Sequence, residues 1–203
     1  MDVGIRNTLL GIAAFISIIL GLLIASLVIP RPMSSDEAEQ IGWYHFDQPR
    51  EINDFVMVDH DGKEVGLSVF RGQWSLVFFG FTTCPDICPT TLSVLNESVK
   101  KLDSPPQVVM ITVDPERDSP QKLRGYVPAF NALFRGFTGS FDQTVSLAEQ
   151  MNIAFGKIPG PEPGTYTMDH TASIVLIDPY GRYAGFIKAP HRPEHITKVL
   201  RSL

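Results

Sequence analysis

The chain has 203 residues, a formal net charge of −5 and only two cysteines. That length fits one domain of ordinary size or two very small ones. Because 22 Asp and Glu outnumber 17 Lys and Arg and no basic run stands out, we expect no nucleic-acid partner. Two cysteines are also too few for a disulfide-dense secreted scaffold or a four-cysteine metal cluster.

The N-terminus contains a long uncharged segment. No charged residue lies between Arg6 and Arg31, and residues 9–29 contain only Gly and Ser besides hydrophobic side chains. A helix of that length covers roughly 30 Å, the hydrocarbon thickness of a bilayer. The run exceeds the about 7–15 apolar residues of a cleaved signal peptide, and no small-x-small site follows it. We therefore predict that residues 1–30 form an uncleaved transmembrane anchor.

The charges around this segment bear on its orientation. One Arg flanks each end, and Asp36, Glu37 and Glu39 follow on the C-terminal side, which favours an inside N-terminus and an outside domain. No Arg- and Ser-rich amphipathic presequence precedes the segment. We expect a single-pass protein of a bacterial inner membrane with its soluble domain in the periplasm.

The next segment differs in composition from both of its neighbours. Residues 31–50 are polar and interrupted by prolines, which is typical of a tether. About 150 residues remain, and a chain of that length buries one hydrophobic core. We predict a tether over residues 31–50 and one folded domain over residues 51–203.

The first half of this domain predicts strands around a helix. Residues 55–67 predict a hairpin with its turn at 60–63. Residues 75–81 and 108–113 are continuous apolar runs, typical of strands buried on both faces of a sheet. Apolar residues at helical spacing between them predict a helix over residues 90–102. Strand, helix and strand together indicate a right-handed parallel crossover.

The second half adds helices and a hairpin. A serine before a proline predicts a helix over residues 119–128, and apolar spacing predicts helices over 142–151 and 193–203. Residues 172–177 and 183–187 flank a turn-rich connection and predict an antiparallel hairpin. We predict an α/β fold of thioredoxin-like kind, a mixed central sheet flanked by helices on both faces.

Both cysteines lie in one segment directly after the first buried strand. Open α/β sheets carry their sites at the carboxyl ends of strands. We expect Asp86 to cap the following helix, so that Cys84 lies in the turn and Cys88 in the first helical turn. A helix N-terminus lowers thiol pKa values, and thiolates attack disulfides or bind metals. Both chemistries are therefore open to the pair.

The spacing of the pair favours metal binding without excluding a disulfide. A static structural disulfide is disfavoured because closing so short a loop adds little stability. Three residues separate Cys84 from Cys88, whereas a redox thioredoxin usually has two. Thiolates select copper(I), zinc or iron–sulfur clusters, and two sulfurs need a further ligand. Among five histidines, His170 precedes a predicted strand at a sheet edge, and the adjacent Asp169 is a candidate acceptor for its ring. Spacing alone leaves the ligand set open.

Several stretches resemble the Sco/SenC family, whose members are membrane-anchored thioredoxin-fold proteins that bind copper and help assemble cytochrome c oxidase. They run in the family's order across the soluble domain. The similar stretches are residues 79–89 (FGFTTCPDICP), 113–118 (VDPERD) and 169–172 (DHTA), the last leading to 178–182 (DPYGR).

The resemblance implies a copper carrier rather than an enzyme. Its ligands for copper(I) or copper(II) would be Cys84, Cys88 and His170, with Asp169 beside the histidine. Oxidation of the two cysteines to a disulfide would remove both sulfur ligands. The implied partners are the copper-site subunit of cytochrome c oxidase, other periplasmic copper carriers and thiol reductants. Asp114 of the second stretch receives no chemical role.

Other functions use the same residues. A periplasmic thiol–disulfide oxidoreductase would use Cys84 and Cys88 to reduce the cysteines of the oxidase copper site. A peroxidase is disfavoured, because Phe81 stands where a peroxiredoxin has threonine, three residues before the cysteine. A zinc enzyme is conceivable from two cysteines and a histidine, yet no convincing general base accompanies them.

Overall fold

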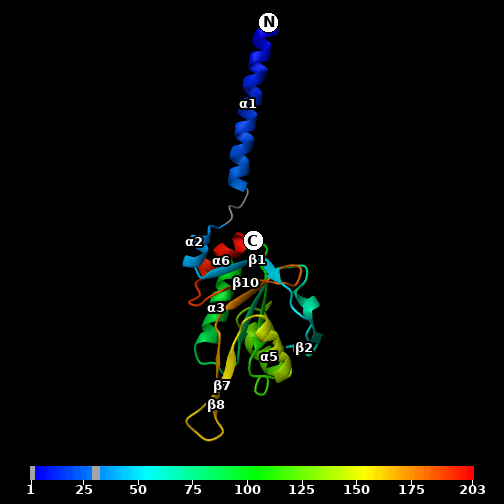
Figure 1. The fold of residues 1–203 in the computed structure, drawn as a ribbon, viewed down its shortest axis with the longest axis vertical. Helices are drawn as coiled ribbons and strands as arrows, with labels where there is room; N and C mark the ends of the chain where they lie inside the picture. Colours follow the sequence, from blue (N-terminus) through cyan, green and yellow to red (C-terminus); the bar gives the residue numbers. More distant parts are fainter. Residues whose placement is uncertain (1–2, 29–32) are drawn as a thin grey trace.

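A computed structural model of the chain describes residues 3–28 and 33–203. The first element is helix α1 (Val3–Val28), which extends away from the other elements (Figure 1). Its stretch Gly4–Ser26 is long and apolar enough to cross a membrane, and none of it is buried. Exposed apolar side chains along a whole helix suit a bilayer environment. The ends of the predicted anchor, residues 1–2 and 29–30, lie outside the described residues.

Eight strands form one mixed sheet. They are β1 (Trp43–Arg50), β2 (Met57–Asp59), β3 (Glu64–Val65), β4 (Ser75–Gly80), β5 (Gln107–Thr112), β6 (Arg135–Thr138), β9 (Ile174–Ile177) and β10 (Tyr183–Ile187). Their order is β1-β10-β9-β4-β5-β6-β2-β3. The pairs β4–β5 and β5–β6 are parallel, whereas the other pairs are antiparallel. The predicted parallel centre with antiparallel edges is confirmed.

The helices cover the sheet as the sequence predicts. They are α3 (Ile87–Val99), α4 (Pro120–Tyr126), α5 (Phe141–Gln150) and α6 (Pro193–Arg201), with 3-10 turns at Leu67–Phe70 and Val127–Ala129. Helix α3 packs against α6, where the Thr197 hydroxyl donates to the Ser98 carbonyl. Figure 1 shows α5 on the other side of the sheet. The Ser119 hydroxyl accepts the Lys122 N–H and caps α4, as its position before a proline predicts.

The core lies between these layers. Every side chain of β4 and β9 is buried, and in β5 only the first residue is partly exposed. Continuous apolar runs are required there because both faces of these strands are covered by other parts of the domain. Burial of this surface is the main stabilising contribution to the fold.

The predicted tether is wrong from Ser35 onwards. Residues Ser35–Gln40 form helix α2, and β1 follows it as the edge strand beside β10, with Trp43 opposite Ile187. Trp43 is buried in the core. Pro49 is compatible with β1 because an edge strand does not need every backbone N–H for pairing. A proline would be unfavourable only in a strand in the interior of a sheet. The folded part of the chain therefore begins before residue 51.

A third hairpin, besides the two that the sequence predicts, was not expected. Strands β7 (Phe155–Pro159) and β8 (Tyr166–His170) pair with each other in a separate two-stranded sheet. Figure 1 shows this hairpin projecting from the end of the domain away from α2. Most of its side chains are exposed, so no apolar run marks it in the sequence.

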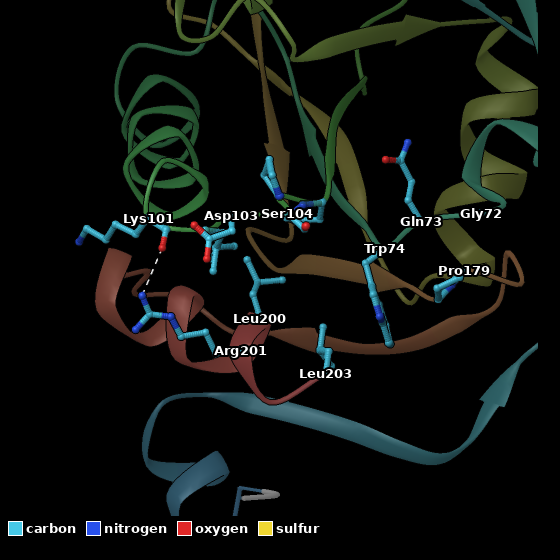
Figure 2. A pocket seen from close by; sticks show the side chains of 13 residues that line it. Gly72, Gln73, Trp74, Lys101, Asp103, Ser104, Pro179, Leu200, Arg201 and Leu203 are labelled. Atoms are coloured by element: carbon cyan, nitrogen blue, oxygen red, sulfur yellow. Dashed lines mark hydrogen bonds between the residues drawn. The ribbon is translucent and has the colours of Figure 1, made fainter. Parts of the chain in front are cut away.

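A hollow of about 580 Å³ opens at the amino ends of β4 and β5. Trp74 and Leu200 line it, and Arg201 donates to the Lys101 carbonyl at its rim over 3.2 Å (Figure 2). No cysteine or histidine is among its lining residues. Sites in α/β sheets lie at the carboxyl ends of strands, so this hollow is separate from the candidate site.

The packing of α3 makes a prediction about stability. Leu95 is fully buried, and its replacement by Ala removes apolar contacts and leaves a cavity. We expect Leu95→Ala to lower the free energy of unfolding by about 2–5 kcal/mol. Urea denaturation followed by circular dichroism measures the change. The matched control Leu133→Ala, at a side chain that is 78% exposed, should shift it by less than about 0.5 kcal/mol. Equal losses would contradict this packing.

Candidate metal site

The strand pairing brings three chain segments to one edge of the sheet. Strands β4 and β5 run parallel with Gly80 opposite Thr112, and the Val113 N–H donates to the Gly80 carbonyl over 2.9 Å. The segments that leave these strands therefore lie side by side. Strand β9 runs antiparallel to β4 with Ile174 opposite Phe78, so the residues before β9 arrive at the same edge.

Cys84, Cys88 and His170 meet at this edge. One ligand atom from each lies within 4.8 Å of the others. Cys88 Sγ is 3.5 Å from His170 Nε2, and the Cys88 N–H donates to Cys84 Sγ over 3.4 Å. The three residues singled out in the sequence are therefore neighbours in space. Both cysteines are free thiols here, and the disulfide between them stays a prediction.

The two thiols differ in their surroundings. Cys88 is fully buried, whereas Cys84 is partly exposed. Burial raises the pKa of the Cys88 thiol and outweighs the lowering that we expected from the helix N-terminus. Asp86 does precede the first residue of α3, but its side chain makes no capping hydrogen bond. Cys88 therefore favours the protonated form unless a cation compensates the charge of its thiolate.

The His170 ring is held in one orientation. It packs edge-on against Phe78 and Phe81, with centroid distances of 5.8 and 5.9 Å. Its Nδ1 donates to the Thr171 carbonyl over 3.2 Å, which leaves the lone pair of Nε2 directed toward Cys88. Burial lowers the pKa of His170, so the neutral, ligating form is favoured at pH 7.

The acceptor for the His170 ring is not the one expected. We predicted the Asp169 carboxylate, but the acceptor is the Thr171 backbone carbonyl. Successive side chains of a strand point to opposite sides, and Asp169 is exposed on the side away from the ring. Its negative charge still raises the pKa of His170, against the larger effect of burial.

A buried carboxylate that the sequence analysis missed supports the cysteine segment. Asp118 is fully buried and accepts hydrogen bonds from the Thr82 N–H at 2.9 Å and the Thr82 hydroxyl at 2.5 Å. It also accepts the Thr112 hydroxyl over 2.7 Å. Asp118 thus ties the segment before Cys84 to the end of β5. Asp118 is the last residue of the 113–118 stretch that resembles the Sco/SenC family, and this resemblance was the sequence signal that could have singled it out.

Two other histidines have structural partners. His60 Nδ1 accepts the Gly136 N–H over 2.9 Å. His191 Nε2 donates to the Ala172 carbonyl over 2.7 Å. These hydrogen bonds account for the positions of the two imidazole rings without a bound ligand. Neither residue belongs to the group formed by the cysteines and His170.

Two members of the group, Cys84 and His170, are partly exposed, whereas Cys88 is buried. His170 lines an open hollow of about 390 Å³ together with residues of β7 and β8. Two sulfurs and a neutral imidazole nitrogen are donors that suit copper(I) or zinc. The same pair of thiols also suits thiol–disulfide exchange.

Comparisons with known proteins agree with this arrangement. The family model described as SCO1/SenC matches residues 45–203. A putative copper-binding protein of Stutzerimonas stutzeri is 36% identical over 159 residues, covering 75% of this chain and 77% of its own length. The mitochondrial protein SCO2 homolog of Mus musculus is 37% identical over 153 residues, covering 73% of this chain and 60% of that protein. The structure of Bradyrhizobium japonicum ScoI with copper bound matches with a TM-score of 0.64 at 35% identity, over 74% of this chain and 98% of that one.

Gly80 gives a prediction about packing beneath the site. A Cβ there would lie 2.7 Å from Phe78 Cε1 and 3.0 Å from Cys88 Sγ, so one of them must shift. We expect Gly80→Ala to lower the free energy of unfolding by about 1–3 kcal/mol in urea denaturation. Gly125→Ala is the matched control, because nothing lies within 4 Å of its Cβ position in α4. The control should raise stability by about 0.5–1 kcal/mol. A neutral Gly80→Ala would contradict this packing.

Proposed function

Since this chain belongs to the SCO1/SenC family, we propose that it binds one copper ion through Cys84, Cys88 and His170. The observation that carries the proposal is the convergence of these ligand atoms within 4.8 Å at the carboxyl end of β4. A relative that is 35% identical has been solved with copper bound, which favours copper over zinc for the same kind of donor set.

The three side chains suit copper chemistry in complementary ways. Cys84 and Cys88 each release a proton when they ligate, and the positive charge compensates the buried thiolate of Cys88. His170 is already neutral and directs Nε2 toward Cys88. Two sulfurs and one nitrogen suit three-coordinate copper(I), whereas copper(II) needs a further ligand from water or protein.

We propose that the protein is a carrier that delivers copper to the copper-site subunit of cytochrome c oxidase. Delivery by ligand exchange requires ligands that a partner reaches, and Cys84 and His170 are both partly exposed. Oxidation of Cys84 and Cys88 to a disulfide releases two electrons and two protons and removes both sulfur ligands. Copper loading therefore requires a thiol reductant as a further partner.

His170 separates copper binding from disulfide exchange. We expect His170→Ala to weaken copper(I) binding at least about a hundredfold, because a ligand is lost outright rather than a supporting contact. Competition with a chromophoric chelator measures the affinity. Disulfide exchange with a small thiol should persist, since Cys84 and Cys88 remain.

The matched control for this experiment is His45→Ala, at an exposed histidine on β1. It should leave copper affinity unchanged. If His170→Ala also leaves copper affinity unchanged, the ligand assignment is wrong. If the unaltered chain catalyses disulfide exchange but binds no copper, the oxidoreductase function is favoured.

We further propose that α1 anchors the chain in a bacterial inner membrane with the domain in the periplasm. The exposed apolar stretch Gly4–Ser26 and the acidic residues that follow it support this topology.

This topology predicts how the domain responds to protease. In spheroplasts we expect added protease to digest the domain, whereas in intact cells the outer membrane should protect it. Immunoblotting of the domain measures this, with a cytoplasmic protein as the protected control. Protection in intact spheroplasts followed by digestion after lysis would indicate the opposite orientation.

A further inference from the structure

The 113–118 stretch holds a charged cluster that copper ligation does not use. Asp114 is 1% exposed, and its carboxylate accepts the Tyr166 hydroxyl over 2.9 Å and forms an ion pair with Arg117. Arg117 Nη1 donates to the Tyr166 carbonyl over 3.0 Å, and its guanidinium lies 3.9 Å from the centroid of the Tyr166 ring. Tyr166 is thus held by its hydroxyl, its ring and its backbone.

Tyr166 begins the strand that His170 ends. Alternate side chains of a strand share one side, so Tyr166, Met168 and His170 face the domain together. Met168 is buried, whereas Thr167 and Asp169 are exposed. The span from Tyr166 to His170 is about 13 Å at the rise of a β-strand. Asp114 and Arg117 therefore hold the far end of the strand that presents the histidine.

The hairpin needs such contacts because it pairs with no strand of the main sheet. An isolated two-stranded hairpin is marginally stable in water. The exposed ion pair between Lys157 of β7 and Glu116, at 2.7 Å, adds little because solvent screens it. The docked position of β8 therefore depends mainly on its three inward side chains.

One short stretch thereby contacts both halves of the ligand set. Asp118 binds Thr82 of the cysteine segment, and four residues earlier Asp114 binds Tyr166 of the histidine strand. Both carboxylates belong to one turn after β5. That turn therefore fixes the distance between the cysteine segment and the strand that carries His170. Ligands held at a fixed separation lose less conformational entropy on binding a metal ion.

We infer that Asp114 and Arg117 are positioning residues, which latch Tyr166 and so hold His170 Nε2 beside Cys88 Sγ. The latch deepens the proposed function, since its consequence for copper rests on His170 being a ligand. When the latch opens, only the fraction of molecules with β8 docked binds copper at full affinity, and the apparent affinity falls to that fraction of its full value.

Tyr166→Phe tests the latch, because it removes the hydroxyl donor and keeps the ring. In the metal-free full chain in detergent, we expect amide hydrogen exchange over residues 167–171 to accelerate about tenfold, the effect of losing a hydrogen bond to a charged group. We expect copper(I) affinity to fall by the ratio of the two docked fractions, which is at most about tenfold. The free energy of unfolding should fall by no more than the equivalent of that roughly tenfold change, because only this contact is lost. Tyr180→Phe, at a tyrosine that is 74% exposed, is the matched control and should change none of these.

A second arm separates positioning from a general structural effect. In the His170→Ala background, Tyr166→Phe should cause no further loss of copper affinity, because the ligand it positions is absent. Unchanged hydrogen exchange in Tyr166→Phe would overturn the latch, as would equal affinity losses in both backgrounds. If His170→Ala by itself leaves copper affinity unchanged, the proposed copper site fails, while exchange in the metal-free chain still decides the latch.

Discussion

The parallel pairing of β4 with β5 is the constraint on which the rest of the site depends. Both strands are buried runs, and their register sets Gly80 beside Thr112. The two segments that leave these strands must therefore run side by side. One carries the cysteines and the other carries Asp118, whose buried carboxylate joins them through Thr82 and Thr112. A buried carboxylate with several donors is costly to disturb, so this junction is rigid.

Patterns that arise from burial were predictable, and so was much of the site. The apolar runs of β4 and β5 predicted the centre of the sheet, and the position of Cys84 and Cys88 after β4 predicted the edge at which they meet His170. The predictions that failed concern features that depend on other segments of the chain, which the local sequence does not reveal. Pro49 fits a strand only because β1 is an edge, and the β7–β8 hairpin is exposed and has no apolar period. The partner of His170 is a backbone carbonyl, which no side-chain pattern reveals.

The two halves of the ligand set differ in rigidity. Cys88 begins a helix packed into the core, and a Cβ on Gly80 would touch its sulfur. His170 instead ends a hairpin outside the main sheet. Local stability in a protein is uneven, and ligand-exchanging segments come from its less stable parts. A firmly held sulfur beside a histidine on a separately docked strand suits the proposed carrier, which would both hold a copper ion and release it.

The position of Met33 limits how far the domain moves if α1 spans a bilayer. Met33 already packs against the core, and α1 ends at Val28, so the five steps between them span at most about 18 Å. The domain then stays in a thin layer above the lipid surface, with the β7–β8 end turned away from α2 (Figure 1). Encounter with a membrane partner becomes a search in two dimensions. If such a partner accepts copper as proposed, its own metal site must lie within the distance from the membrane that His170 reaches on this tether.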